Sequence, residues 1–274
     1  MTYDRFVSPP HLVEDGFLIP KLRLLEIWPL YPFVGDRGDL TVLDVGGNIG
    51  LWCQAWMQTF GSLTAVYHAF EPLPGNVEVF KGRLQQGRVS RFEKVRLHNT
   101  CVGHEDGEVT LKTHANVSST ASVLLDSIQV GSTLVQNDKH HSCKQIRVDT
   151  FLEENGIAHV DLMKVDVEGY EWNVLQGARE SISGGRIGAI YFEFGQHQGE
   201  LGQSFRMFWD FLQSHGFYVY RTYHYRNFFG LQQIHEYHES LENFGYVWMI
   251  LASAVSHKQA LNRPLVIGRY KPPA

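Results

Sequence analysis

Residues 41–50, TVLDVGGNIG, constrain the fold of this chain more than any other stretch. The stretch begins as a short β-branched and apolar run, which is typical of a buried strand. It then breaks into a turn at Gly46, Gly47 and Gly50, and an apolar run with helical spacing follows at residues 49–60. A strand, a glycine turn and the start of a helix bring a backbone close to a nucleotide-like ligand, because a Cβ would block the approach. We therefore expect the rest of the chain to be organised around a ligand held at this turn.

The spacing of the glycines indicates which ligand fits. A dinucleotide-binding turn follows G-x-G-x-x-G, but Asn48 and Leu51 stand where the second and third glycines belong. This difference argues against a nicotinamide enzyme. Asp44 adds a carboxylate just before the turn, and that charge would repel a pyrophosphate but attract an ammonium or sulfonium group. A smaller, cationic ligand is therefore favoured.

A second anchor lies at Glu71, which follows the next expected strand at residues 65–70. A carboxylate in this position can accept hydrogen bonds from both hydroxyls of a ribose. The alternative is a charge that favours a helix N-terminus. Taken with the glycine turn, the ribose interpretation is preferred. S-adenosylmethionine explains both sites, with the backbone and Asp44 near its methionine part and Glu71 on its sugar.

Strands alternate with helices over most of the chain, which predicts an α/β fold with a largely parallel sheet. The last two expected strands, at residues 217–223 and 246–252, have no good helix between them and should be antiparallel. We predict a class I methyltransferase (Rossmann-like) fold with a seven-stranded, mostly parallel sheet and one antiparallel terminal strand. The methyltransferase domain is assigned to residues 39–256, after an N-terminal extension or cap at 1–38 and before a C-terminal tail at 257–274.

The middle of the chain is less regular. A strand at residues 95–102 leads through a turn at 105–107 to a further strand at 108–113, which we expect to be its hairpin partner. Residues 127–144 show no strong period. We interpret them as an exposed excursion with one strand at 132–135.

Five motifs, in their order and spacing, resemble the FkbM family of methyltransferases. They are D-V-G-G-N-I-G at 44–50, F-E-P at 70–72, N-T-C-V-G at 99–103 leading to D-G at 106–107, V-D at 148–149, and L-M-K-V-D-V-E-G-Y-E at 162–171. The resemblance runs from about Leu40 to about Phe194. It implies a class I methyltransferase fold, S-adenosylmethionine as cofactor, and usually O-methylation of a hydroxyl on a sugar, polyketide or other secondary metabolite.

Together with this resemblance, the motifs place the cofactor-binding residues at Asp44, Gly46, Gly47, Asn48, Gly50, Glu71, Pro72, Cys101, Val102 and Asp166. Gly47 departs from the family, in which alanine is more common at this position. We expect this glycine to loosen the turn slightly without abolishing binding.

Methyl transfer is an in-line displacement, for which the protein must align the acceptor and accept its proton. Ligands bind at the carboxyl ends of the strands in such sheets, which nominates Asp166, Glu168, Glu193 and His197 as catalytic candidates. Asp166 closes an expected strand and is the first choice as base or acceptor-orienting group. Glu193 lies inside an apolar strand, so it should have a partner or face the cleft. His197 follows in a loop, where a merely hydrogen-bonded histidine is the alternative.

Glu168 leaves more than one interpretation open. It can act as a base or orienting group, pair with Asp166 around a divalent metal, or provide a favourable charge at a helix N-terminus. A magnesium site needs further oxygen ligands, and two carboxylates in D-x-E do not define one. No metal is therefore assigned.

Composition excludes several classes of protein. The net charge of -5 argues against binding nucleic acid mainly through charge. Residues 166–169, D-V-E-G, also stand where an adenine-methylating enzyme would carry D/N-P-P-Y/F. The three cysteines are far apart and odd in number, which argues against a disulfide framework and favours a reducing, cytoplasmic location. We find no signal-peptide pattern and no apolar run long enough to span a membrane.

We therefore expect an S-adenosylmethionine-dependent O-methyltransferase that acts on a hydroxyl of a carbohydrate or secondary metabolite. The acceptor would be a small molecule or a glycan, and a homodimer is one assembly to test. An N-methyltransferase on a small amine or peptide stays open, because the acidic groups of the pocket would also attract an amine. A cofactor-binding scaffold without catalysis is the alternative from a different class.

Overall fold

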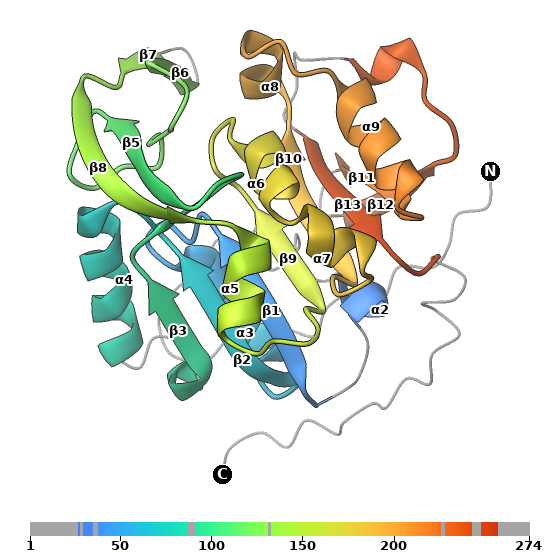
Figure 1. Ribbon diagram of the computed structural model, residues 1–274, viewed down its shortest axis with the longest axis horizontal. Helices are drawn as coiled ribbons and strands as arrows, with labels where there is room; N and C mark the ends of the chain where they lie inside the picture. Colours follow the sequence, from blue (N-terminus) through green and yellow to red (C-terminus); the bar gives the residue numbers. More distant parts are fainter. Residues whose placement is uncertain are drawn as a thin grey trace.

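A large sheet with helices on both faces forms the centre of the molecule (Figure 1). The computed structural model describes residues 27, 30–34, 38–86, 91–130, 133–225, 228–242 and 248–256. The strand order is β12-β11-β13-β10-β9-β1-β2-β3. The bounds of these strands are β1 Leu40–Val45, β2 Thr64–Phe70, β3 Val95–His98, β9 Leu162–Val165, β10 Ala189–Phe194, β11 Tyr218–Tyr225, β12 Phe228–Ile234 and β13 Trp248–Ser253.

Five neighbouring strands of this sheet, β3, β2, β1, β9 and β10, run parallel. The last strand, β13, lies between β10 and β11 and is antiparallel to both. This arrangement confirms the predicted α/β class I methyltransferase fold. The predicted number of seven strands is wrong, because the described residues form a sheet of eight.

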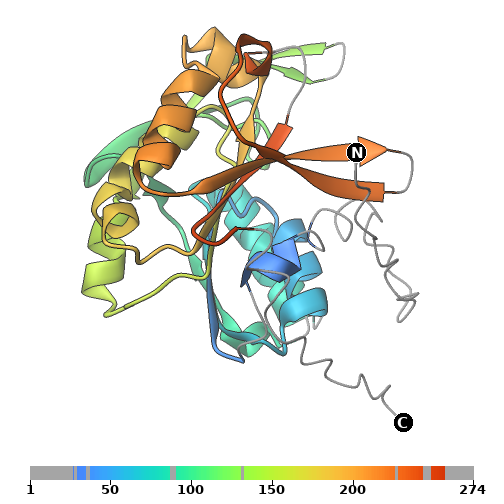
Figure 2. The ribbon, with the colours of Figure 1, turned by 90° about the vertical axis from the view of Figure 1, so that its right-hand side faces the viewer.

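The additional strand is β12, which pairs with β11 as an antiparallel hairpin. The hairpin projects from the body of the molecule and is drawn in orange in Figure 2. Its sequence, FFGLQQI, contains a glycine and no strict alternation of apolar and polar residues. The structure therefore identifies β12 by its pairing with β11, whereas the sequence pattern of β12 alone does not predict a strand.

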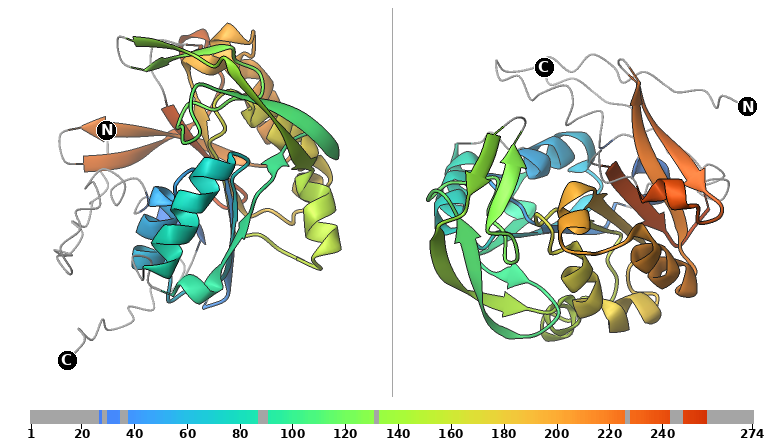
Figure 3. Two further views of the ribbon diagram at one scale, coloured as in Figure 1. Left: turned by 90° about the vertical axis from the view of Figure 1, so that its left-hand side faces the viewer. Right: turned by 90° about the horizontal axis from the view of Figure 1, so that it is seen from above.

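Helices cover the two faces of the sheet with separate apolar cores. One face carries α5 Val148–Glu154, α6 Glu171–Gly177, α7 Arg179–Ser183 and α9 Phe205–Ser214. The other carries α2 Tyr31–Val34, α3 Leu51–Phe60 and α4 Pro74–Gln85. Figure 3 shows these layers from above. The short helices α8 Gln196–Glu200, η2 Phe92–Lys94 and η3 Glu239–Leu241 complete the set of described helices.

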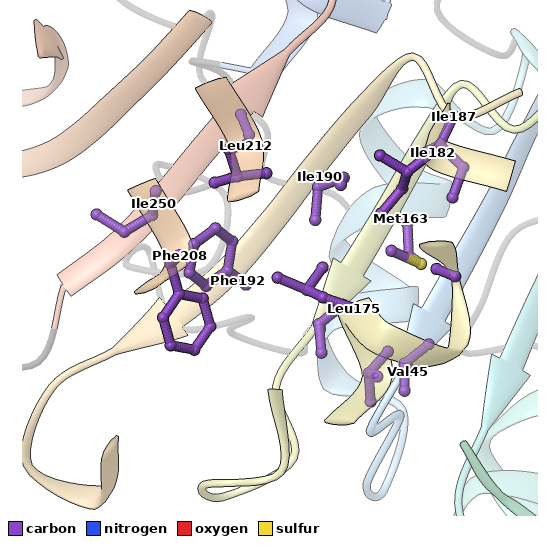
Figure 4. Close-up of a cluster of buried hydrophobic side chains, with 14 of the residues drawn as sticks. Val45, Met163, Leu175, Ile182, Ile187, Ile190, Phe192, Phe208, Leu212 and Ile250 are labelled. Carbon is purple, nitrogen blue, oxygen red and sulfur yellow. The ribbon is translucent and has the colours of Figure 1, made fainter. Parts of the chain in front are cut away.

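The larger of the two cores fixes the position of the parallel strands. Figure 4 shows Met163 of β9, Ile190 and Phe192 of β10 and side chains of the covering helices in contact. The rings of Phe192 and Phe208 are stacked with their centroids 5.3 Å apart. Ser204 caps α9, since its hydroxyl accepts a hydrogen bond from the Met207 amide. Packing on this face of the sheet thus positions the parallel strands, whose carboxyl ends meet at one edge.

A second, three-stranded sheet corrects the expectation for the middle of the chain. It has the order β4-β8-β5, with β4 Cys101–Val102, β5 Gly107–Thr113 and β8 Lys139–Ile146, and β6 Ser127–Val130 pairs with β7 Thr133–Gln136 beside it. The expected single strand at residues 95–102 is divided between two sheets, and β5 pairs with β8. The expected exposed excursion at 127–144 is three strands. One of them, β7, agrees with the strand expected at 132–135, whereas β6 and β8 were missed. β8, KHHSCKQI, gave no apolar pattern because it is mostly polar and is held by the neighbouring strands β4 and β5.

Most of the N-terminal extension and the whole C-terminal tail, 257–274, lie outside the described residues, so their roles stay predictions. In the extension, Ile27, Leu30, Phe33 and Val34 are described. All four are buried in the core on the α3 face of the sheet.

Candidate active site

The glycine turn at the end of β1 requires glycine at two positions. Gly46 has a φ of 82°, and a Cβ there would lie 1.8 Å from the carbonyl oxygen of Asp166. Gly50 has a φ of 84°, and its Cβ would lie 2.4 Å from the ring of Phe80. Both positions combine a left-handed backbone with a close approach. The turn can therefore pack directly against the end of β9 and against α4.

Glu71, which follows β2, is hydrogen-bonded to this turn. Its Oε2 accepts a hydrogen bond from the Asn48 amide at 2.8 Å, and its Oε1 accepts from the Leu73 amide at 2.9 Å and from Asn76 Nδ2 at 3.2 Å. Burial raises the pKa of Glu71 to about 7, against the lowering effect of these three donors. A carboxylate offers about four acceptor positions, so one remains for a ligand.

Lys164 of β9 links three parts of the site and was missed in the sequence. Its ammonium donates to the carbonyl oxygen of Gly46 at 2.8 Å and lies 3.0 Å from Asp44 Oδ1 and 3.3 Å from Asp166 Oδ2. The side chain is almost completely buried. A lysine inside the buried strand LMKV was the available signal, because lysine is rarely buried without partners.

Asp44 lies beneath the turn and is fully buried. Its Oδ2 accepts a hydrogen bond from the Tyr67 hydroxyl at 2.7 Å, and its other oxygen faces Lys164. It is not among the residues that line the cavity. This position differs from the expected direct contact with a cationic ligand, because Lys164 already supplies the positive charge that Asp44 attracts.

Four carboxyl groups interact with one another near the ends of β9 and β10, namely Asp166, Glu168, Glu171 and Glu193. Burial, followed by the charges of neighbouring carboxylates, raises the pKa values of Glu168 and Glu193 well above the ordinary range. A hydrogen bond between Glu193 and Asp166 further raises the pKa of Glu193. The raised pKa favours the protonated form of Glu193, which can donate in this bond to Asp166.

His197 lies next to one of these carboxyl groups, that of Glu168. Its Nδ1 lies 3.2 Å from Glu168 Oε2, and burial is the main cause that lowers its pKa. Asp166, Glu168 and Glu193 line the cavity, whereas His197 is not among the lining residues. Of the four candidate catalytic residues, three are therefore in a position to touch a ligand.

A cavity of about 810 Å³ lies between the glycine turn and the carboxyl groups. Ligand sites commonly measure about 300–1,000 Å³. Its lining includes most of the expected cofactor residues, with Gly46, Gly47, Asn48, Glu71, Pro72, Cys101, Val102 and Asp166, and also Trp52, Asn76, Ser118, Ser119, Lys164, Arg221, Thr222 and Met249. Gly50 does not line the cavity. Its lack of a Cβ leaves room for the ring of Phe80.

Asn76 of α4 binds the loop of the cavity that contains Ser118 and Ser119. Its Nδ2 donates to the Ser118 carbonyl at 2.7 Å, and its Oδ1 accepts from the Ser118 amide at 3.0 Å. Because Asn76 also donates to Glu71, it connects that loop to the glycine turn. Nothing in the local sequence around Asn76 indicates a partner 42 residues away.

Two further findings concern the described residues only. No helix there is long and apolar enough to cross a membrane. No group of three or more His, Cys, Asp or Glu side chains in this part of the chain is arranged to hold a metal ion.

Comparison with known proteins identifies the family. The family model of the methyltransferase FkbM domain matches residues 44–219. The chain belongs to the FkbM methyltransferase family. This result confirms the family expected from the five motifs, and with it the assignment to methyltransferases.

Relatives of this FkbM domain are distant. Methyltransferase 1 of Beauveria bassiana (strain ARSEF 2860) is 25% identical over 183 residues, which cover 63% of this chain and 70% of that protein. The AMB antimetabolite synthetase AmbE of Pseudomonas aeruginosa is 26% identical over 204 residues, covering 66% of this chain and 10% of AmbE. A crystal structure of methyltransferase FkbM from Methylobacillus flagellatus KT shares 13% identity at a TM-score of 0.47, covering 79% of this chain and 44% of that chain. This chain thus spans less than half of that solved protein and a tenth of AmbE.

Glu171, at the start of α6, makes the stability of the fold depend on pH. Burial raises its pKa to about 7 from an ordinary 4.5, so its stabilising contribution is present below pH 4.5 and is lost as the pH rises through 7. We expect this group to remove about 2 kcal/mol of unfolding free energy between pH 5.5 and 8. Urea unfolding at both pH values measures this change.

The matched variant is Glu171→Gln, whose neutral amide resembles the protonated acid. It should lack this part of the pH dependence. The pKa of His68 is lowered to about 4 mainly by burial, so histidines of this kind make the free energy of unfolding rise with pH. Their effect should be the same in the wild type and in Glu171→Gln. Identical pH dependence in the two proteins would contradict the assignment.

Proposed function

We propose that this FkbM family member is an S-adenosylmethionine-dependent O-methyltransferase that acts on a hydroxyl of a carbohydrate or secondary metabolite. The observation that carries the proposal is that the glycine turn, Glu71, Asp166 and Glu193 all line one cavity. A cofactor held by the turn and Glu71 would therefore share this cavity with a proton acceptor.

The glycine turn, Glu71 and the residues next to them fit an adenosyl cofactor. The turn at Gly46 leaves its backbone open to the cavity, and Glu71 retains an acceptor position for a ribose hydroxyl. Pro72, Cys101 and Val102 form the neighbouring wall, which suits the adenine ring. When bound, this cofactor supplies a methyl group on a sulfonium.

Asp166 and its neighbours fit the acceptor. Asp166 is partly exposed, Lys164 Nζ lies 3.3 Å from its Oδ2, and Glu193 is hydrogen-bonded to it. An ionised carboxylate at the carboxyl end of β9 can orient an acceptor hydroxyl and take up its proton. Glu168 and Glu193 would then position the acceptor by hydrogen bonds.

Two measurements test this proposal. Calorimetry should detect binding of S-adenosylmethionine and S-adenosylhomocysteine, and a failure to bind either would refute the cofactor assignment. Transfer of a labelled methyl group should then be measured over a panel of sugars, hydroxylated metabolites and amines. Binding without transfer to any acceptor would favour the non-catalytic scaffold.

N-methylation is the second candidate. The observation that favours it is the wall of three carboxyl groups, Asp166, Glu168 and Glu193, which would attract an ammonium group. The amines in the panel separate the two candidates, because label on an amine with none on hydroxyl compounds would replace O-methylation by N-methylation. A cytoplasmic location, supported by three free thiols, and a homodimer remain further proposals.

Glu71→Gln tests the ribose assignment. Because the pKa of Glu71 is about 7, the ionised acceptor becomes populated as the pH rises, and we expect the wild-type affinity for S-adenosylhomocysteine to increase about tenfold between pH 6 and 8. The Glu71→Gln variant should bind about tenfold more weakly at pH 8 and should lose this pH dependence. Calorimetry at both pH values measures it.

The control is Glu78→Gln, the same change on the exposed face of α4. It should leave the affinity and its pH dependence as in the wild type. A Glu71→Gln variant that binds like the control would remove Glu71 from the cofactor site.

A further inference from the structure

Two cysteines that are far apart in the sequence meet at the cavity. Cys101 of β4 and Cys143 of β8 are 42 residues apart, and their Sγ atoms lie 2.8 Å from each other. Cys101 is buried and lines the cavity. Cys143 is partly exposed and is not among the lining residues. Both are free thiols.

The contact distinguishes the two sulfur atoms chemically. The hydrogen bond from Cys101 is the main cause that lowers the pKa of the Cys143 thiol. The same bond and burial raise the pKa of Cys101. Either thiol can be the donor in this contact, and the opposite directions of the two pKa shifts make Cys143 the sulfur with more thiolate character. The thiolate is the reactive form of cysteine, and Cys143 is also the more accessible of the two.

The approach needed for a covalent bond is short. The sulfur atoms of a disulfide lie about 2.05 Å apart, so each would move by less than about half an ångström. The two strands are already hydrogen-bonded neighbours, with Cys101 opposite Gln145. The small sheet thus presents two thiols side by side, one of them inside the cavity wall.

We propose that Cys101 and Cys143 form a site of reversible oxidative modification, where a hydroperoxide converts the two thiols into a disulfide in the cavity wall. This chemistry does not depend on the proposed methyl transfer. The modification joins β4 to β8 and encloses the segment that carries Ser118 and Ser119 of the cavity. The disulfide would therefore make the cofactor cavity depend on the oxidation state of Cys101 and Cys143.

The steps balance as follows for hydrogen peroxide. The Cys143 thiolate attacks one peroxide oxygen, the O–O bond breaks, and hydroxide leaves and is protonated to water, which gives a sulfenic acid. The Cys101 sulfur then attacks the Cys143 sulfur, the S–S bond forms, and a second water leaves with the thiol proton. The two thiols lose two electrons, and the peroxide is reduced to two waters. A dithiol such as dithiothreitol reverses the reaction by thiol–disulfide exchange.

The first test counts thiols in the full chain. The reduced protein has three cysteines, and treatment with one equivalent of hydrogen peroxide should leave a single thiol that reacts with an aromatic disulfide reagent in denaturant. Dithiothreitol should restore all three. The oxidised protein should stay monomeric on a non-reducing denaturing gel, and peptide mapping should find Cys101 linked to Cys143. Three remaining thiols, a linkage through Cys53, or sulfinic acid as the main product would overturn the proposal.

Two variants make the test specific. Cys143→Ser leaves the cavity-lining Cys101 in place and should form no intramolecular disulfide. Cys53→Ser removes the buried cysteine of α3 and should still lose both remaining thiols. Loss of thiols in Cys143→Ser to the same extent as in the wild type would contradict the pairing.

The second test measures the connection to the cavity. Bond formation draws the Cys101 sulfur toward Cys143 and away from the cavity, so we expect the oxidised protein to bind S-adenosylhomocysteine at least about fivefold more weakly than the reduced protein. Cys143→Ser should bind equally well with and without peroxide. Equal affinity of the two wild-type forms would refute the connection. If the reduced protein fails to bind at all, the cofactor assignment falls while the thiol count still decides the disulfide.

Discussion

Replacing Asp166 with asparagine is expected to lower kcat for methyl transfer by about 10²–10⁴-fold. Asparagine preserves the size of the side chain but cannot take up the acceptor proton. The loss should appear in kcat because proton uptake occurs in the transition state and not on cofactor binding. The labelled methyl assay, with the best acceptor from the panel, measures the rate, and calorimetry should find the affinity for S-adenosylhomocysteine nearly unchanged.

Asp210→Asn provides the matched control for this experiment. Asp210 lies on the exposed side of α9, where it pairs with Arg206 at 2.8 Å, and its replacement should leave the rate as in the wild type. Full activity of Asp166→Asn would refute the base assignment. Equal loss of rate and of cofactor affinity would instead make Asp166 a binding residue.

The features that the sequence predicts well are those encoded within one strand–turn–helix unit. Gly46 and Asn48 follow directly after β1, and Glu71 follows directly after β2, so their positions depend on local turns and on the rule that parallel strands end at one edge. The structure adds that Glu71 and Asn48 are joined by a hydrogen bond. This contact joins the two motifs directly in this chain.

The features that the sequence could not predict depend on contacts between distant segments. Asn76 reaches Ser118, and Cys101 reaches Cys143, each across 42 residues. Pairing of β8 with β4 brings the two cysteines together, and β8 has too few apolar residues to indicate its partners. Long-range pairing of a polar strand leaves no periodic signal in a single sequence.

The hydrogen-bond partner of Glu193 is another contact that the sequence alone could not identify. Its position inside an apolar strand correctly indicated a partner or a cleft. The identity of the partner, Asp166, required the order of β9 and β10 in the sheet. Local chemistry thus predicts that a buried charge is satisfied, while topology determines which residue satisfies it.

The second large effect concerns Lys164. The Lys164→Met variant should lose about 3–5 kcal/mol of unfolding free energy, because it leaves the fully buried Asp44 without its cation. Urea unfolding measures this loss. Lys81→Met, at an exposed lysine of α4 that pairs with Glu78, is the control and should change stability by less than about 0.5 kcal/mol.

The double variant Asp44→Asn/Lys164→Met separates the two roles of Lys164. It removes both buried charges, so most of the lost stability should return. Methyl transfer should not return with it, because Asp166 still lacks the ammonium group that lies 3.3 Å away in the wild type. If the two single changes simply add in stability, Asp44 and Lys164 are not coupled. If the double variant regains both stability and rate, Lys164 serves the fold alone, and the charge on Asp166 must be maintained by its other neighbours.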